Sequence, residues 1–283
     1  LSIICFIGLN DGFCQILHES NQQAHQSLDG FVENKGQFSA MNGEAVPFVL
    51  FKKEAPGLNF YLTETGATFL FTETELIENK PGIGEDTTRS IVNWERVDLI
   101  IEGGDFNPSN ITKLSRTSES HNNYYTGNAP NGIKSVYTYD KIIIHDIYPQ
   151  IDFVVYNQSD KGFKYDFVLK SGANAEDIQL KYRSKQKMHL NANGALSLET
   201  EYGNLLEDAP ISFMNGEPIE SQFQLSTTYN VVFGGFDNSV TFKIPEYAQT
   251  QISDQTKENE LIIDPEVVWA TFYGGNSIDW SSA

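Results

Sequence analysis

Cysteine is nearly absent from this sequence, and basic residues are scarce. The 283 residues include two cysteines, Cys5 and Cys14, so the chain from residue 15 onward has no thiol for a disulfide, a nucleophile or a metal site. Lys and Arg number 19 against 38 Asp and Glu, which gives a formal net charge of −19. Because such a surface repels phosphate backbones and anionic lipids, we expect neither nucleic-acid binding nor electrostatic membrane binding.

Long hydrophobic runs are also lacking. The apolar stretch at residues 1–9 ends at Asn10-Asp11, far short of the roughly 20 residues that a transmembrane helix needs. Its length suits the core of a signal peptide, and Gly12 and Cys14 before Gln15 fit the small-residue cleavage pattern. We therefore predict that residues 1–14 are a signal peptide remnant and that the protein is secreted or at the cell surface. A buried N-terminal strand is the alternative.

The sequence lacks the short catalytic motifs of common enzymes: there is no nucleophile elbow, phosphate loop or His-x-x-x-His zinc motif. Among its five histidines, His145 with Asp146 and Asp152 could be read as a base and its orienting acid. Adjacent residues of a strand face opposite sides of the sheet, so His145 and Asp146 should not pair. We expect a structural or surface histidine and no catalytic residues.

Aromatic residues are plentiful, with 19 Phe and 13 Tyr, and both favour strands. Residues 15–30 are polar and predict a flexible leader. From residue 31, short apolar runs alternate with turn signals such as Asn193-Gly194 and Asn215-Gly216, and only residues 173–178 look helical. We predict an all-β fold, a large antiparallel β-sandwich-like domain over residues 31–266 with little helix and with 31–118 and 119–266 as candidate lobes.

A series of short motifs follows one another in a fixed order along the chain. They are residues 31–37 (FVENKGQ), 123–128 (NYYTGN), 147–156 (IYPQIDFVVY), 164–169 (KYDFVL), 178–182 (IQLKY), 261–265 (LIIDP) and 269–275 (WATFYGG). Together they resemble an uncharacterised N-terminal domain that precedes SBBP-type β-propeller repeats in secreted, cell-surface proteins of gliding-type bacteria. The resemblance covers nearly all of residues 31–283.

The resemblance implies export and a multi-domain cell-surface protein, with residues 267–283 as the truncated start of a propeller repeat. We expect those residues either to lack order or to pair with the domain as an edge strand. No catalytic residues are established for the family, so it assigns none here. Gln150 departs from the family, which usually has Gly at this turn, and Gly tolerates a positive φ that Gln resists.

Oxygen-rich loops and strand aromatics supply the candidate binding residues. Calcium is the ion that suits the loops at 105–110, 237–238 and 264, although turn residues bonding local backbone explain the same pattern. Exposed rings could stack on sugar faces, and Tyr124, Tyr125 and Trp94 form the predicted aromatic platform, with Tyr137 and Tyr139 as further members. Because neighbouring strand residues point opposite ways, we expect one of Tyr124 and Tyr125 to be exposed.

Two functions of different classes fit these observations. The first is a non-enzymatic structural, adhesion or docking module that contacts a glycan or protein partner at the cell surface, which predicts an exposed aromatic patch. The second is a hydrolase or carbohydrate-binding module that acts on surface polysaccharide. A glycosidase of this kind needs two carboxylates roughly 5–10 Å apart.

Overall fold

The computed structural model describes residues 15–16, 29–40, 43–77, 89–115, 121–125, 131–158, 162–265 and 267–271. The predicted signal remnant, residues 1–14, lies outside them. So does most of the predicted leader, of which Gln15–Ile16 and residues 29–30 are described. The all-β class is confirmed, since strands dominate this part of the chain and the α-helix in it, α1, has 8 residues.

The strands are antiparallel wherever they pair. Their bounds are β1 Gln15–Ile16, β2 Phe31–Glu33, β3 Val49–Ala55, β4 Leu58–Thr63, β5 Gly66–Ile77, β6 Arg89–Ile101, β7 Ile111–Ser115, β8 Asn122–Tyr124, β9 Ile133–Val136, β10 Thr138–Tyr148, β11 Ile151–Gln158, β12 Gly162–Lys170, β13 Leu180–Ser184, β14 His189–Leu190, β15 Leu196–Glu199, β16 Gly203–Glu207, β17 Ile211–Met214, β18 Glu217–Glu220, β19 Gln222–Asn230, β20 Gly235–Lys243, β21 Glu260–Asp264 and β22 Val267–Thr271. The helices are α1 Glu246–Ser253 and the short 3-10 turns η1 Pro108–Asn110 and η2 Ala175–Asp177.

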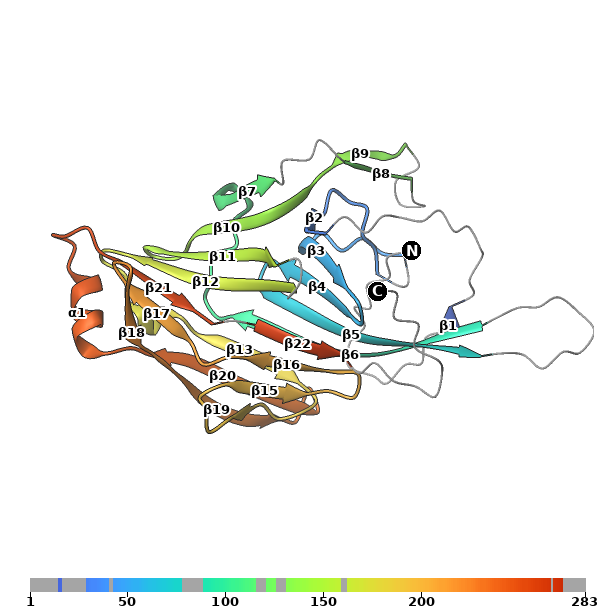
Figure 1. Cartoon of the computed structure of the whole chain (residues 1–283). Coiled ribbons are helices and arrows are strands. Elements are labelled where there is room, and N and C mark those ends of the chain that lie inside the picture. Colours follow the sequence, from blue (N-terminus) through green and yellow to red (C-terminus); the bar gives the residue numbers. More distant parts are fainter. Residues whose placement is uncertain are drawn as a thin grey trace, which may run out of the picture.

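One 16-stranded sheet forms the body of the molecule (Figure 1). Its order is β18-β17-β21-β12-β11-β10-β2-β3-β4-β5-β6-β13-β20-β19, with β1 added beside β6 and β7 beside β10. The two strands at the ends of this order, β18 and β19, are separated in sequence by Ser221 alone. The chain itself therefore joins the two edges, and the sheet is curled until it is nearly a barrel.

A four-stranded sheet, β14-β15-β16-β22, shares its core with the large sheet. Leu198 and Leu205 of the small sheet belong to the same apolar cluster as Phe60 and Phe163 of the large one. The rings of Phe60 and Phe163 lie 4.1 Å apart between centroids, although β4 and β12 are far apart in sequence. This single cluster spans both candidate lobes, 31–118 and 119–266. Each buried Phe contributes about 1.5–3 kcal/mol of hydrophobic stabilisation.

Turn residues act as the sequence predicts in several hairpins. Asn215 and Gly216 both have positive φ and join β17 to β18, with Met214 opposite Glu217. Gln150 also has a positive φ, 63°, in the tight turn where Tyr148 pairs with Ile151. The turn therefore has left-handed geometry at Gln150, and Gln carries the steric cost of that conformation.

Some elements differ from expectation. Residues 230–233 read as a strand but include the tip of the hairpin between β19 and β20, where Val231 and Val232 are exposed. Helix α1 was not expected. It begins after Pro245, and Ala248 and Ile252, four residues apart, bury its inner side. Strand β7 lies within residues 103–120, which are mostly polar. Strand β16 was not expected from the hydrophobic pattern either.

The C-terminal segment enters the small sheet. Strand β22 pairs with β16, with Val267 opposite Glu207 and Thr271 opposite Gly203, and it forms one edge of the sheet. Residues 272–283 lie outside the described part of the chain. Pairing as an edge strand is one of the two arrangements expected for this segment.

Candidate functional site

The β8–β9 hairpin carries the exposed aromatic residues that the sequence singled out. It forms its own two-stranded sheet and leads directly into β10 (Figure 1). Tyr125, just after β8, is 69% exposed, whereas Tyr124 is half-buried. Tyr137, between β9 and β10, is 37% exposed. The expectation that one tyrosine of the Tyr124–Tyr125 pair faces solvent is therefore confirmed.

Alternation along β8 places several of these side chains on one face. His121, Asn123 and Tyr125 are exposed, and the residues between them are not. Asn123 Oδ1 accepts a hydrogen bond from the Ser135 N–H at 3.0 Å, which fastens β8 to β9. The ring of Tyr125 lies against Gly132, where a Cβ would come within 2.5 Å of it. Gly132 therefore leaves room for the tyrosine ring at the end of the hairpin.

A lysine from another part of the chain approaches the same hairpin. Lys35 donates from Nζ to the Ser135 carbonyl oxygen at 3.0 Å, and the same Nζ lies 6.0 Å from the ring centroid of Tyr137. The His121 ring is 5.6 Å from the Tyr137 ring. We call Lys35, His121, Tyr125 and Tyr137 the hairpin patch.

The other predicted aromatic residues lie in different surroundings. Trp94, on β6, is half-buried and packs against the second apolar cluster, which contains Tyr61 and Leu70. Tyr139 is half-buried on β10 and packs at the margin of the main core, with Lys113 5.7 Å from its ring centroid. Trp94 is a packing residue here, so the solvent-facing part of the predicted platform is Tyr125 together with Tyr137.

His145 takes part in a hydrogen-bonded chain across three strands. Its Nδ1 is 3.1 Å from Asp152 Oδ2 on β11, and its Nε2 is 2.9 Å from Thr112 Oγ1 on β7. The β10–β11 register shifts between Ile144 and Tyr148, and the contact between His145 and Asp152 lies in this irregular stretch. The order hydroxyl–imidazole–carboxylate is that of a nucleophile, a base and an orienting acid.

Other contacts to Asp152 favour a structural role for this chain. Lys170 Nζ donates to Asp152 Oδ1 at 2.7 Å, and the Asp146 N–H donates to the same oxygen at 3.0 Å. Burial alone would raise the pKa of Asp152, but the bonds from Lys170, the Asp146 N–H and His145 outweigh it and hold the pKa below its usual value. The carboxylate is thus ion-paired with an ammonium group as well as hydrogen-bonded to the imidazole.

The loops considered for calcium use their oxygens for other partners. Asp105 Oδ1 accepts the Asn107 N–H, and Asn107 in turn caps η1. Asp264 is paired with Lys164. Within the described part of the chain, no group of three or more His, Cys, Asp or Glu residues is arranged to hold a metal ion. These loop residues match the alternative in which turn side chains bond local backbone or ion-pair partners.

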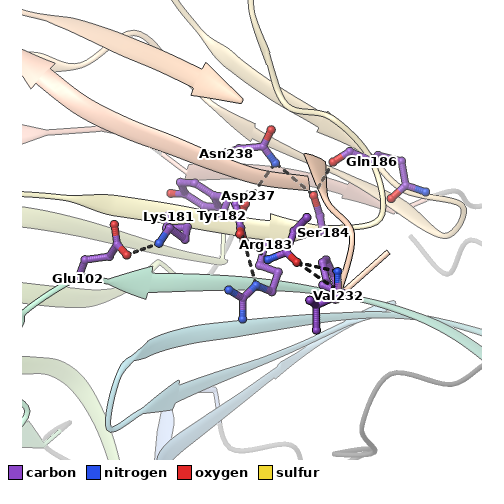
Figure 2. Close-up of polar contacts among 11 residues, drawn as sticks. Glu102, Lys181, Tyr182, Arg183, Ser184, Gln186, Val232, Asp237 and Asn238 are labelled. Carbon is purple, nitrogen blue, oxygen red and sulfur yellow. Dashed lines mark hydrogen bonds and ion pairs between the residues drawn. The ribbon is translucent and has the colours of Figure 1, made fainter. Parts of the chain in front are cut away.

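The third calcium candidate, Asp237-Asn238, supports the β13–β20 pairing (Figure 2). Asp237 accepts from Arg183 Nε at 2.9 Å. Asn238 is fully buried, and its amide donates to the Tyr182 carbonyl oxygen at 3.1 Å. Its Oδ1 accepts the Met188 N–H at 3.0 Å. Because the amide of Asn238 already donates and accepts these hydrogen bonds, it links the strands and has few lone pairs left to bind an ion.

Glu207 is a buried carboxyl that the sequence reading missed. It is completely buried on β16, and the phenols of Tyr165 and Tyr182 both donate to it, the first at 3.0 Å. Burial raises the pKa of Glu207 to about 7, although the two phenol hydrogen bonds oppose the rise. The alternation of residues along β16 could have revealed it. Leu205 and Glu207 lie on the same inward face of the strand, so a carboxyl occupies a position where an apolar residue is expected.

The carboxylates of Asp166 and Asp264 share one lysine, Lys164. Lys164 Nζ is bonded to Asp264 Oδ2 and lies 3.4 Å from Asp166 Oδ1. Burial raises the pKa of Asp166 to about 6, with the charge of Lys164 lowering it and that of Asp264 raising it further. One lysine carries a single positive charge, so it offsets only part of the charge of the two acids, and the raised pKa of Asp166 reflects burial together with the charge of Asp264.

The described helices include none that is long and apolar enough to cross a membrane. No curated protein and no solved structure shows significant similarity to the chain. Residues 31–266 match the family described as "Domain of unknown function (DUF7948)", and they are the same residues that the sequence pattern marks as one β-rich domain. This match spans most of the 283 residues, so the chain belongs to the DUF7948 family.

Proposed function

We propose that this chain is a non-enzymatic binding module of an exported, cell-surface protein, and that the hairpin patch is the part that contacts a glycan. The observation that carries this proposal is the exposure of Tyr125 and Tyr137, at 69% and 37%, on one short hairpin. Phenol rings at such positions offer an apolar face for stacking on the C–H face of a sugar and a hydroxyl for hydrogen bonding.

The difference in exposure between these two tyrosines and the buried aromatic residues supports a binding role for the hairpin patch. Most of the large buried side chains of the protein are Phe and Tyr that fill the core, as strand aromatics generally do. Tyr125, at 69% exposed, forgoes much of the hydrophobic stabilisation that full burial of a large side chain gives, about 1.5–3 kcal/mol, and Tyr137, at 37%, forgoes a smaller part. An exposed aromatic surface on a well-packed domain is typical of a binding site.

The polar clusters support a module without catalysis. Asp152, Asp166, Asp237 and Asp264 each have a lysine or arginine partner. Glu207 is enclosed between two phenols. These groups stabilise the sheet through paired charges and hydrogen bonds, and substrate would have to displace those partners to reach them.

A glycan-array screen of the purified chain tests the proposal. We expect binding to at least one surface glycan, weakened about tenfold or more by Tyr125→Ala or Tyr137→Ala, since a stacked aromatic contact contributes on the order of 1–2 kcal/mol. The matched control is Tyr247→Ala on α1, because Tyr247 is 55% exposed but lies outside the hairpin. Equal loss with Tyr247→Ala, or no binding to any glycan, would contradict the proposal.

One observation favours the alternative of a hydrolase, namely the chain Thr112–His145–Asp152. If it is catalytic, Thr112 Oγ attacks the carbonyl carbon of a sugar ester, its proton passes to His145 Nε2 and then to the departing sugar oxygen, and water later releases the acid. This predicts hydrolysis of an acetylated polysaccharide that Thr112→Ala abolishes. Unchanged turnover in Thr112→Ala, or no turnover above buffer, removes this alternative.

A further inference from the structure

We infer that the ligand of the hairpin patch is an acidic polysaccharide, one whose sugars carry carboxylates. This inference rests on the proposed function and narrows it to a chemical class. Its basis is the distribution of charge and the position of Lys35 beside an exposed ring.

Acidic residues avoid the two segments that form the patch. The chain has 38 Asp and Glu among 283 residues, yet residues 34–43 and 120–139 contain none. The same segments contribute Lys35, Lys134 and His121, all of them exposed. These two segments are therefore neutral to basic on a protein with a net charge of −19, and the charge of Glu54 on β3 acts on Tyr124, the half-buried tyrosine of the hairpin. An acidic polymer is repelled by most of the surface and can approach closely here.

Lys35 is positioned to receive a carboxylate. One of its three ammonium donors is used on the Ser135 carbonyl oxygen, at 3.0 Å, which fixes Nζ near the Tyr137 ring and leaves two donors. Other lysines, among them Lys53, Lys113 and Lys164, are ion-paired. Among the described residues no carboxylate is paired with Lys35. An ammonium group held beside an exposed ring matches a sugar that presents an apolar face and an attached carboxylate.

The positive charge of Lys35 and the exposed tyrosine rings together distinguish an acidic polysaccharide from acidic peptides and from neutral polysaccharides. The aromatic face of Tyr125 and Tyr137 adds nothing for an acidic peptide such as polyglutamate, which lacks a sugar face. A neutral polysaccharide would use the rings but not Lys35. The acidic polysaccharide is the ligand that uses both parts of the patch.

The test compares matched polymers with the whole chain. The polymers are polygalacturonate, alginate, carboxyl-reduced polygalacturonate and polyglutamate, and affinity gel electrophoresis gives their dissociation constants. We expect binding to a polyuronate, about tenfold weaker binding to the carboxyl-reduced polymer, and no binding to polyglutamate. Lys35→Gln should weaken polyuronate binding about fivefold and leave the carboxyl-reduced polymer unaffected.

The control for charge is Lys257→Gln, because Lys257 is exposed and lies near α1, outside the hairpin. It should change neither affinity. Equal affinity for the native and carboxyl-reduced polymers overturns the acidic ligand while leaving glycan binding intact. Binding to polyglutamate with the affinity of the polyuronates overturns it too, because charge alone would then decide. Failure of every polysaccharide here and on the array overturns this inference and the proposed function together.

Discussion

Glu207 and Asp152 are both buried carboxyl groups, but their surroundings give them opposite acidities. Glu207 lies between the two sheets and meets the neutral phenols of Tyr165 and Tyr182, and burial raises its pKa to about 7. Asp152 lies on the outer face of the large sheet. There Lys170, a backbone N–H and His145 overcome the effect of burial and lower its pKa. Burial is the largest single influence on the pKa of both groups: the donors around Asp152 together outweigh it, whereas the two phenols do not outweigh it at Glu207, which is also the more deeply buried of the two.

The two carboxyl groups therefore limit stability at opposite ends of the pH range. The folded state holds the Glu207 proton more tightly than the unfolded chain does, so stability falls as pH rises from about 4.5 to about 7. The folded state holds the Asp152 proton less tightly, so its contribution is present above the ordinary value of 3.8 and is lost as pH falls further. Substitutions at each site can separate the two effects.

Glu207→Gln should have the largest effect. The amide keeps the size of the side chain and cannot ionise, so the variant escapes the cost of a buried charge. We expect the variant to be more stable than the native chain at pH 8.5 by on the order of 3 kcal/mol, and close to it at pH 4. Urea unfolding followed by fluorescence at several pH values measures the difference.

The control for this variant is Glu199→Gln on the neighbouring strand β15, because Glu199 is exposed. Its stability relative to the native chain should not depend on pH in this way. A Glu207→Gln difference that stays constant from pH 4 to pH 8.5 would show that Glu207 ionises normally and that the comparison with Asp152 is unfounded.

Asp152→Asn should have the next largest effect, with the opposite sign. It removes the negative charge that Lys170 and His145 share, while its amide oxygen can still accept the Asp146 N–H. We expect a loss of about 1.5 kcal/mol at pH 7, the lower end of the range for hydrogen bonds to charged groups. The variant should also lose less stability than the native chain between pH 4 and pH 2.

Asp208→Asn is the matched control, since Asp208 is an exposed aspartate. It should leave the unfolding free energy at pH 7 within about 0.5 kcal/mol of the native value. If Asp152→Asn behaves like Asp208→Asn, the contacts of Lys170 and His145 with the carboxylate contribute nothing measurable, as is common for exposed ion pairs.

The fold was largely predictable where local sequence fixes local geometry. The strands of the β4–β5 hairpin and the Asn215-Gly216 turn follow from alternation and turn chemistry, and both are present. Alternation also requires Tyr124 and Tyr125 to face different ways, which predicts that one of them is exposed, and the structure shows that it is Tyr125.

Contacts that depend on pairing between distant strands were not predictable. Thr112 meets His145 because β7 pairs with β10, and nothing in the polar residues 103–120 indicated that strand. Lys35 meets the hairpin through a contact 100 residues apart in sequence. Glu207 meets two tyrosines because the small sheet packs on the large one, an arrangement that strand patterns leave open.

Gln150→Gly should have a smaller, stabilising effect beside Asp152. Gln150 has φ 63° in the turn that brings β10 and β11 together, and its carbonyl oxygen accepts the Lys170 N–H at 2.9 Å. Glycine removes the steric cost of this conformation, about 1–2 kcal/mol, and the greater freedom of glycine in the unfolded chain offsets part of the gain. We expect a net gain of about 0.5–1 kcal/mol in the unfolding free energy.

The control is Gln222→Gly on β19, where φ is not positive. The same substitution there should destabilise the protein by about 0.5–1 kcal/mol, because glycine weakens a strand. A loss of stability in Gln150→Gly would mean that the Gln150 side chain makes a compensating contact in the turn.

Thr112→Ala should have the smallest effect, and it isolates the role of Asp152 in the hydrogen-bonded chain. Thr112 is exposed, so loss of its bond to His145 should change stability by less than about 0.5 kcal/mol. Asp152 accepts from Nδ1, so the neutral imidazole should remain the Nδ1–H tautomer in this variant. Nitrogen-15 NMR of the His145 ring reports the tautomer directly, and Asp152→Asn is the comparison that should alter it. A tautomer that changes in Thr112→Ala and persists in Asp152→Asn would show that the hydroxyl, rather than the carboxylate, orients the ring.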